Sequence, residues 1–368
     1  MLRGGDTTTS TNTQIIEPIG MHENIPLNKK AKIRVSLFCA MILFLFARCD
    51  IFLDEHDHFD CVQSIIQKTD MDSLTHFVEE LSGEIETNIH GTPYTIRSRN
   101  KYYEGNEKAA LYIKQKFESY GLSTYEQVAD DSCKNIVAVQ KGTDYPDQEY
   151  ILCAHYDSQP RAEVSPGADD NASGTAVVIE AARILSKYDT KYTLVYALWD
   201  EEEYGYAGSR YYARTAEQKS ESIVGVIDLD MLGWDENDDG KFDIVTDATA
   251  ESIELAQKVA EVNEEYRIGL IASIYNKEVH SDQLSFWEYG YNAILIIQNV
   301  SDDDVNEYYH SPEDRIEHFN SSYFESLSKL TIGTLAAFAI IEPPEIKFEH
   351  NNLIASCILS EVDKPRAF

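Results

Sequence analysis

The stretch YILCAHYD, residues 150–157, decides the fold of this chain because an apolar run leads directly into polar side chains. Tyr150–Ala154 is short and apolar, which predicts a buried strand with His155 just beyond its carboxyl end. Ligand sites of open α/β sheets lie at that edge. Asp157 follows two residues later and can accept the second imidazole N–H of His155, which would fix the ring's orientation. We therefore expect an α/β fold with a functional site at this edge.

Two more predicted strands end in carboxylates. Tyr192–Leu198 leads into the acidic run of residues 200–203, and Ser222–Leu229 leads to Asp230. Four successive carboxylates repel each other unless cations or water surround them. The acidic run therefore indicates either a cation site or a solvated surface.

The sequence GADDNASG, residues 167–174, leads into Thr175–Lys187, where alanines and aliphatic residues at helical spacing predict a helix. Asp170 lies where this loop turns into the helix, near the positive end of the helix dipole. His310 comes much later, in a loop after a fourth predicted strand, Asn292–Ile297. Two histidines and several carboxylates, without cysteine, are typical of hydrolytic rather than structural zinc sites. Two such ions roughly 3.5–4 Å apart can share one water and polarise a carbonyl oxygen.

The order and content of these segments resemble the M28 family of zinc peptidases, over roughly residues 90–340. The resemblance implies a three-layer α/β/α sandwich around a mixed, mostly parallel central sheet, the zinc-exopeptidase type of fold. It also implies two zinc ions per chain and removal of N-terminal residues from peptides with a free N-terminus. The implied roles are a bridging ligand at Asp170, ligands of one zinc at His155 and Asp230, ligands of the other at Glu203 and His310, a general base at Glu202, and orientation of His155 by Asp157.

Three alternatives stay open. A carboxypeptidase-like relative and a glutaminyl-cyclase-like relative share the fold, and a non-catalytic ectodomain would have lost ligands. The family's cyclases resemble the peptidases but keep one zinc and lose much of the Asp-Asp-Asn-Ala-Ser-Gly loop. That loop is present at residues 169–174, and every implied ligand position is filled. The sequence therefore favours two metals and an enzyme.

A second acidic segment follows the start of a calcium-loop pattern. Asp235, Asn237, Asp239 and Asp243 place oxygen side chains at alternate positions, with a glycine at the sixth position. The twelfth position is Thr246 instead of the glutamate that completes the pattern. We favour an exposed acidic turn here, with Ca²⁺ as the alternative. For Asp282, farther along, the favoured role is a helix N-cap.

The termini differ from the rest of the chain. Residues 1–54 combine a polar tail, a basic cluster at Lys29–Arg34 and an apolar run at Val35–Ala47. That run is shorter than the ~20 residues that span a bilayer, and with its basic flank it predicts an export signal. We expect a secreted or extracytoplasmic protein, with membrane attachment through the apolar segment as the alternative. Residues 55–345 are predicted to form the peptidase domain and residues 346–368 a C-terminal extension.

Composition narrows the choice of partners. The formal net charge of −33 over 368 residues supplies no basic patch for phosphates, which argues against nucleic acid. About 300 residues after the N-terminal segment suit one large α/β domain. Cys153 lies within a predicted buried strand, so we expect a free core thiol there.

Overall fold

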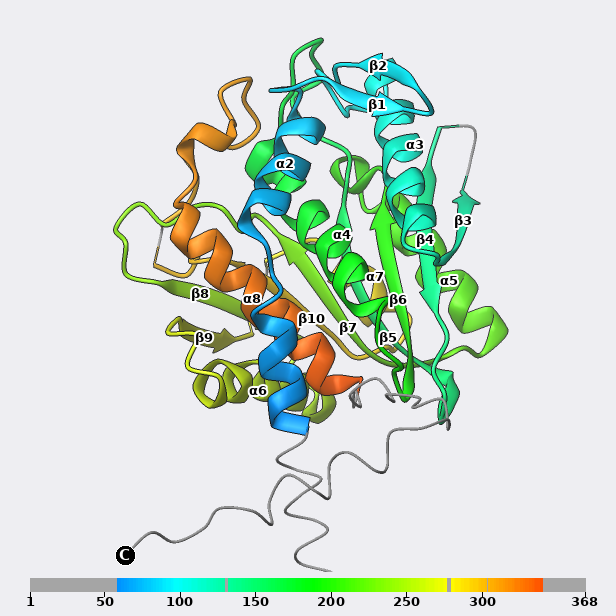
Figure 1. Cartoon of the computed structure of the whole chain (residues 1–368), viewed down its shortest axis with the longest axis vertical. Coiled ribbons are helices and arrows are strands. Elements are labelled where there is room, and N and C mark those ends of the chain that lie inside the picture. The colour runs from blue at the N-terminus through cyan, green and yellow to red at the C-terminus, as the bar shows by residue number, and fades with distance from the viewer. Residues whose placement is uncertain (1–57, 130–131, 277–278, 303, 340–368) are drawn as a thin grey trace, which may run out of the picture. The chain divides into compact units, whose positions relative to one another are not determined.

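The computed structural model describes residues 58–129, 132–276, 279–302 and 304–339 (Figure 1). Residues 1–54, with the predicted export segment, and 346–368 lie outside these ranges, so the predicted domain boundaries there stay predictions. No helix in the described ranges is long and apolar enough to cross a membrane.

The centre of the fold is an eight-stranded mixed sheet (Figure 1). In spatial order its strands are β3 (Ser123–Val128), β4 (Lys134–Gln140), β6 (Tyr192–Trp199), β5 (Tyr145–His155), β7 (Ser222–Asp230), β10 (Ala293–Gln298), β8 (Lys241–Thr246) and β9 (Ile271–Tyr275). The four middle strands β6, β5, β7 and β10 run parallel, and antiparallel pairs join them to the outer strands on both sides. The predicted mixed, mostly parallel sheet is confirmed.

The second half of β5, Tyr150–Ala154, is apolar because helices cover both faces of the sheet there. Successive side chains of a strand point to opposite faces. Leu152 and Ala154 therefore pack into one core cluster, and Ile151 and Cys153 into another. Cys153 is a free, buried thiol, as expected.

Helices form the two outer layers. Buried residues of α2 (Met71–Ser82), α3 (Glu104–Ser119), α4 (Gly174–Leu185), α6 (Ala250–Glu265) and α8 (Ser321–Phe338) share the Leu152 cluster. The opposite cluster contains residues of α5 (Ala207–Lys219) and α7 (Gln283–Glu288), which lie behind the sheet in Figure 1. A small hairpin, β1 (Thr87–Ile89) with β2 (Thr92–Tyr94), precedes α3. The predicted three-layer α/β/α architecture is confirmed.

The parallel strands end at one edge of the sheet. His155 at the end of β5 is in register with Trp199 at the end of β6, and Ala154 with Leu229 of β7. Neighbouring strands lie about 4.8 Å apart. Residues that follow β5, β6 and β7 therefore meet within a few ångströms, although they lie up to 75 positions apart in the sequence.

Candidate metal centre

Two groups of side chains that could hold a metal ion lie at this edge, in the part of the chain that the structure describes. One contains His155, Asp170 and Asp230, and the other contains Asp170, Glu203 and His310. In each group the potential ligand atoms lie within 4.8 Å of one another. All five side chains named from the sequence as ligands are therefore brought together, and both groups share Asp170.

The two oxygens of Asp170 face different histidines. Oδ1 lies 3.2 Å from Nε2 of His155, and Oδ2 lies 3.1 Å from Nε2 of His310. Each histidine also faces a second carboxylate: His155 Nε2 is 3.4 Å from Asp230 Oδ1, and His310 Nε2 is 3.0 Å from Glu203 Oε2. This is the arrangement that a carboxylate bridging two sites requires.

The donor atoms themselves indicate a metal. Apart from the imidazole–carboxylate contacts just given, His155 Nε2, Asp170 Oδ2, Glu203 Oε1 and Asp230 Oδ1 are buried without a hydrogen-bond partner among the described residues. Buried polar atoms are normally hydrogen-bonded, and several unpaired ones together call for an explanation. Nitrogen and carboxylate donors without thiolates suit zinc in an open, hydrolytic site. The residues present therefore fit a pair of zinc ions.

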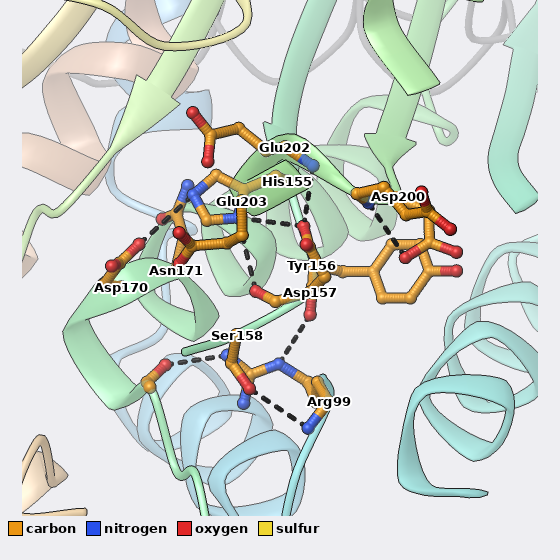
Figure 2. A network of polar contacts seen from close by, with 12 residues as sticks. Arg99, His155, Tyr156, Asp157, Ser158, Asp170, Asn171, Asp200, Glu202 and Glu203 are labelled. Atoms are coloured by element: carbon orange, nitrogen blue, oxygen red, sulfur yellow. Dashed lines mark hydrogen bonds and ion pairs between the residues drawn. The ribbon is translucent and has the colours of Figure 1, made fainter. Parts of the chain in front are cut away.

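Asp157 lies between His155 and the loop that carries Glu202. Its Oδ1 is 3.4 Å from His155 Nδ1 and accepts the backbone N–H of Glu202 at 3.1 Å (Figure 2). The backbone oxygen of Asp157 also lies 3.3 Å from His155 Nδ1. The structure thus places Asp157 where it can orient His155, and adds a contact to the Glu202 backbone that the sequence did not indicate.

The acidic run after β6 divides into two pairs with different environments. Asp200 accepts hydrogen bonds from the Lys134 backbone and the Asn106 side chain, and Glu201 accepts from Lys101 Nζ at 2.7 Å. A positive φ of 58° at Glu201 then turns the chain into the helical turn η2 (Glu202–Tyr204). The carboxylates of Asp200 and Glu201 are therefore hydrogen-bonded within the protein, whereas Glu202 and Glu203 lie at the metal centre.

Glu202 and Glu203 differ in where they point. In Figure 2 the Glu202 carboxylate extends away from that of Glu203, above the His155 ring. Burial raises the pKa of Glu202 above its usual range, and nearby His155 partly opposes this effect. Glu203 reaches His310, as described above. The two neighbours therefore suit different roles, one as a proton acceptor and one as a ligand.

Two aspartates that the sequence analysis missed hold the loop of Asp170. Asp314 accepts the backbone N–H groups of Asp169 and Asp170, both at 3.0 Å. Asp169 in turn accepts from the Gly233 backbone at 2.7 Å and from Asn306 at 3.0 Å. Asp314 lies four positions after His310, so its place in the same loop was the available signal. These bonds tie the His310 loop to the helical turn η1 (Ala168–Ser173) that carries Asp170.

The acidic side chains considered for calcium accept hydrogen bonds from N–H groups of their own loop and from Ser301. Asp235 and Asn237 accept the N–H of Asp239 at 3.2 and 3.0 Å, and Asp243 accepts the N–H and hydroxyl of Ser301. Asp235, Asp239 and Asp243 form no potential metal group within the described ranges. The geometry therefore favours the acidic turn over a calcium site.

Asp282 differs from the expectation that it caps a helix. It stands at the N-cap position of α7, but its side chain makes no capping hydrogen bond, so the predicted cap is wrong. Asp282 is completely buried, and this burial, followed by the neighbouring Asp228, raises the pKa of its carboxyl.

The comparisons with known proteins agree with this geometry. The sequence profile of peptidase family M28 matches residues 135–335, which is more than half of the chain. The chain belongs to this family. The resemblance noted from the sequence is thereby confirmed.

Relatives of this M28 chain include a probable zinc metalloprotease of Pyrenophora tritici-repentis, 31% identical over 202 residues, covering 48% of this chain and 42% of the relative. Aminopeptidase YwaD of Bacillus subtilis is 30% identical over 212 residues, covering 56% of this chain and 45% of that protein. The chain thus spans less than half the length of these two relatives. The solved LapA aminopeptidase of Legionella pneumophila matches with a TM-score of 0.66 and 22% identity, covering 76% of this chain and 75% of that one. That match supports the fold.

Proposed function

We propose that this M28 chain is a zinc-dependent exopeptidase that removes N-terminal residues from peptides. The observation that carries the proposal is the sharing of Asp170 by two ligand groups, with Glu202 beside them. The names of the two relatives, zinc metalloprotease and aminopeptidase, support it.

In this proposal His155, Asp170 and Asp230 would hold one zinc, and Asp170, Glu203 and His310 would hold the other. A bound pair of zinc ions supplies Lewis acidity, which lowers the pKa of water and polarises a carbonyl. Asp157 keeps the His155 ring in the orientation that leaves Nε2 free for the metal, because it faces the other ring nitrogen.

Glu202 acts as the general base. Its carboxylate accepts a proton from the attacking water as the water adds to the scissile carbonyl carbon. The same proton then passes from Glu202 to the departing amine as the peptide bond breaks. The raised pKa of Glu202 suits this exchange, because a base must hold the proton long enough to return it.

The substrate class is inferred from the name of one relative, an aminopeptidase, and from the charge of the chain. The formal net charge is −33, so the field of the whole protein attracts a peptide's α-ammonium group. An acetylated N-terminus lacks that charge. We therefore expect hydrolysis of aminoacyl-anilides and no hydrolysis of their N-acetylated versions by the zinc-loaded protein.

The test is this substrate panel, run on protein whose zinc content has been measured. Cleavage of free-amine substrates alone supports an aminopeptidase. Inactivity of a folded protein holding two zincs would refute it, and C-terminal peptide substrates and cyclisation of N-terminal glutamine would then test the carboxypeptidase-like and cyclase-like alternatives.

Replacing Asp157 by asparagine is expected to weaken zinc binding about 10–100-fold, because the partner that orients His155 is lost while all ligands remain. Competition against a chromophoric chelator measures the effect. Asn237→Asp, in the acidic turn, serves as a control for altered charge. An Asp157→Asn protein with wild-type zinc affinity would rule out the orienting role.

Zinc affinity is also expected to depend on pH. Burial lowers the pKa of His310, but hydrogen bonds to Asp170 and Glu203 outweigh it and raise the pKa from 6.5 to about 10. Metal-free protein therefore holds a proton on His310 at neutral pH, which zinc must displace. We expect affinity at this group to fall about tenfold per unit as pH falls from 10 to 7. By the same linkage, protonated His310 stabilises the metal-free fold. This stabilisation is fully present below pH 6.5 and is lost as pH rises through 10.

Isothermal titration of zinc at several pH values, in buffers of different ionisation enthalpy, counts the protons released. His310→Asn should remove one of them. Equal proton release by wild type and His310→Asn would contradict the expectation.

We also propose that residues 29–47 direct export. Support comes from the basic cluster directly before an apolar run of about thirteen residues. Fractionation of cells that express the full chain and a version lacking residues 35–47 tests this. Retention of both proteins in the cytoplasm would refute export.

A further inference from the structure

A short segment before α3 contacts the loop after β5 and the loop after β6, both of which carry residues of the metal centre. Residues 98–101 precede the part of the chain that matches the M28 profile. Ser98 forms a bridge with Ser165, in the loop before Asp170. Asn100 donates to the Ser158 backbone at 3.0 Å and to the Tyr204 hydroxyl at 2.8 Å, and Lys101 pairs with Glu201.

Arg99 is the central residue of this segment, and its side chain is completely buried. Its guanidinium donates to the backbone oxygens of Tyr156 at 2.7 Å, Leu81 at 2.8 Å and Gly167 at 2.8 Å, and to that of Pro166. Its own N–H donates to the Ser158 hydroxyl at 3.1 Å (Figure 2).

Apart from Leu81 in α2, these acceptors belong to the two segments that must stay in register for the first ligand group to exist. Tyr156 lies between His155 and Asp157, and Gly167 lies three positions before Asp170. The rigid guanidinium of Arg99 therefore bonds to both segments, the end of β5 and the loop of Asp170. Space at Gly167 is also tight. A Cβ there would lie 3.0 Å from Arg99 Nη2 and 2.3 Å from the backbone oxygen of Asp170.

The charge of Arg99 matters as well. A buried cation without compensation is costly, and four carboxylates surround this one: Asp314, Asp170, Asp157 and Glu203. Burial lowers the pKa of Arg99 to about 10, which leaves it charged at neutral pH. Its hydrogen bonds go to neutral carbonyls, so the carboxylates keep their oxygens for other partners.

We propose that Arg99 is a positioning residue of the metal centre: it joins the end of β5 to the loop of Asp170 and thereby sets the zinc affinity of the group His155, Asp170 and Asp230. The proposal rests on the proposed zinc centre but not on the identity of the substrate. Asp170 belongs to both groups, but Arg99 makes no hydrogen bond to Glu203 or His310, so the second group should lose less affinity than the first.

Arg99→Lys is the main test, because lysine keeps the charge but lacks the planar fork that reaches several carbonyls at once. We expect folded protein in which one of the two zinc sites binds about 10–100-fold less tightly, in the range typical of supporting partners of metal ligands. Competition with a chromophoric chelator gives both affinities. The visible absorption of the Co²⁺-loaded protein reports ligand geometry and should change in band position or intensity.

Two further variants complete the design. Arg183→Lys changes an arginine in the last turn of α4, which pairs with Glu180 far from the ligands, and should leave zinc affinity and the Co²⁺ spectrum unchanged. Arg99→Gln removes the charge as well, and should weaken zinc binding at least as much as Arg99→Lys.

Folded Arg99→Lys with both zinc affinities and the Co²⁺ spectrum of the wild type would overturn the proposal. So would failure of Arg99→Lys to fold, since Arg99 would then serve the fold rather than the site. Wild-type protein that binds no zinc would instead refute the proposed function. Wild-type protein that binds two zincs without cleaving anilides would refute only the peptidase assignment.

Discussion

Replacing Glu202 by glutamine is expected to lower kcat on aminoacyl-anilides by about 10²–10⁴-fold, the contribution typical of a positioned general base. Glutamine has nearly the same shape but cannot accept the proton of the attacking water. Glu202 belongs to neither ligand group, so the variant should keep two zinc ions per chain. Steady-state kinetics and metal analysis on the same preparation measure both quantities.

The control for this variant is Glu288→Gln, which removes an exposed ion pair with Arg210 on the surface near α7. Exposed pairs contribute little to stability, and this one lies outside the ligand groups, so kcat should stay within about twofold. A Glu202→Gln protein with near wild-type kcat would exclude Glu202 as the base. Loss of zinc from that variant would place Glu202 among the ligands.

Replacing Asp170 by asparagine is expected to abolish the paired metal site. Asp170 is the one residue that both groups contain, and an amide cannot offer two anionic oxygens to two cations. We expect fewer than two zincs bound and a loss in kcat of at least about 10³-fold, since metal ions supply several kcal/mol of transition-state stabilisation.

Matched variants separate the two groups. Asp230→Asn touches the first group alone, and His310→Asn the second alone, so each should retain one tight zinc. Metal titration with a competing chelator distinguishes the three variants. If Asp170→Asn kept two tightly bound zincs, the bridging role would be excluded, whatever its activity.

Much of the fold was predictable because both faces of the central sheet are covered. Tyr150–Ala154, Tyr192–Leu198 and Ser222–Leu229 are mostly apolar, and they became β5, β6 and β7 with carboxyl ends within one residue of the prediction. The start of β5 lies five residues earlier than predicted. Strand order was not predictable. The antiparallel neighbours β4 and β8 pair with β6 and β10, which are far from them in sequence.

The ligand residues were predictable for a related reason. His155 and Asp230 are the last residues of two adjacent parallel strands, so one topological rule places them side by side. His310 had no such local rule, and only the family resemblance indicated it. The expected cap at Asp282 was wrong because Asp282 itself has helical φ and ψ of −64° and −24°, whereas a capping residue normally has an extended backbone.

By itself, the sequence determined which side chains could bind metal and that they follow buried strands, because periodicity and residue chemistry are local properties. The tertiary structure alone decided which carboxylates remain free for a metal. Asp200 and Glu201 are bonded by Asn106 and Lys101, and Asp314 holds the loop of Asp170. Arg99 bonds to Tyr156, 57 positions away, and no local pattern marks it. Such contacts join distant segments, so they exist only once the sheet has brought those segments together.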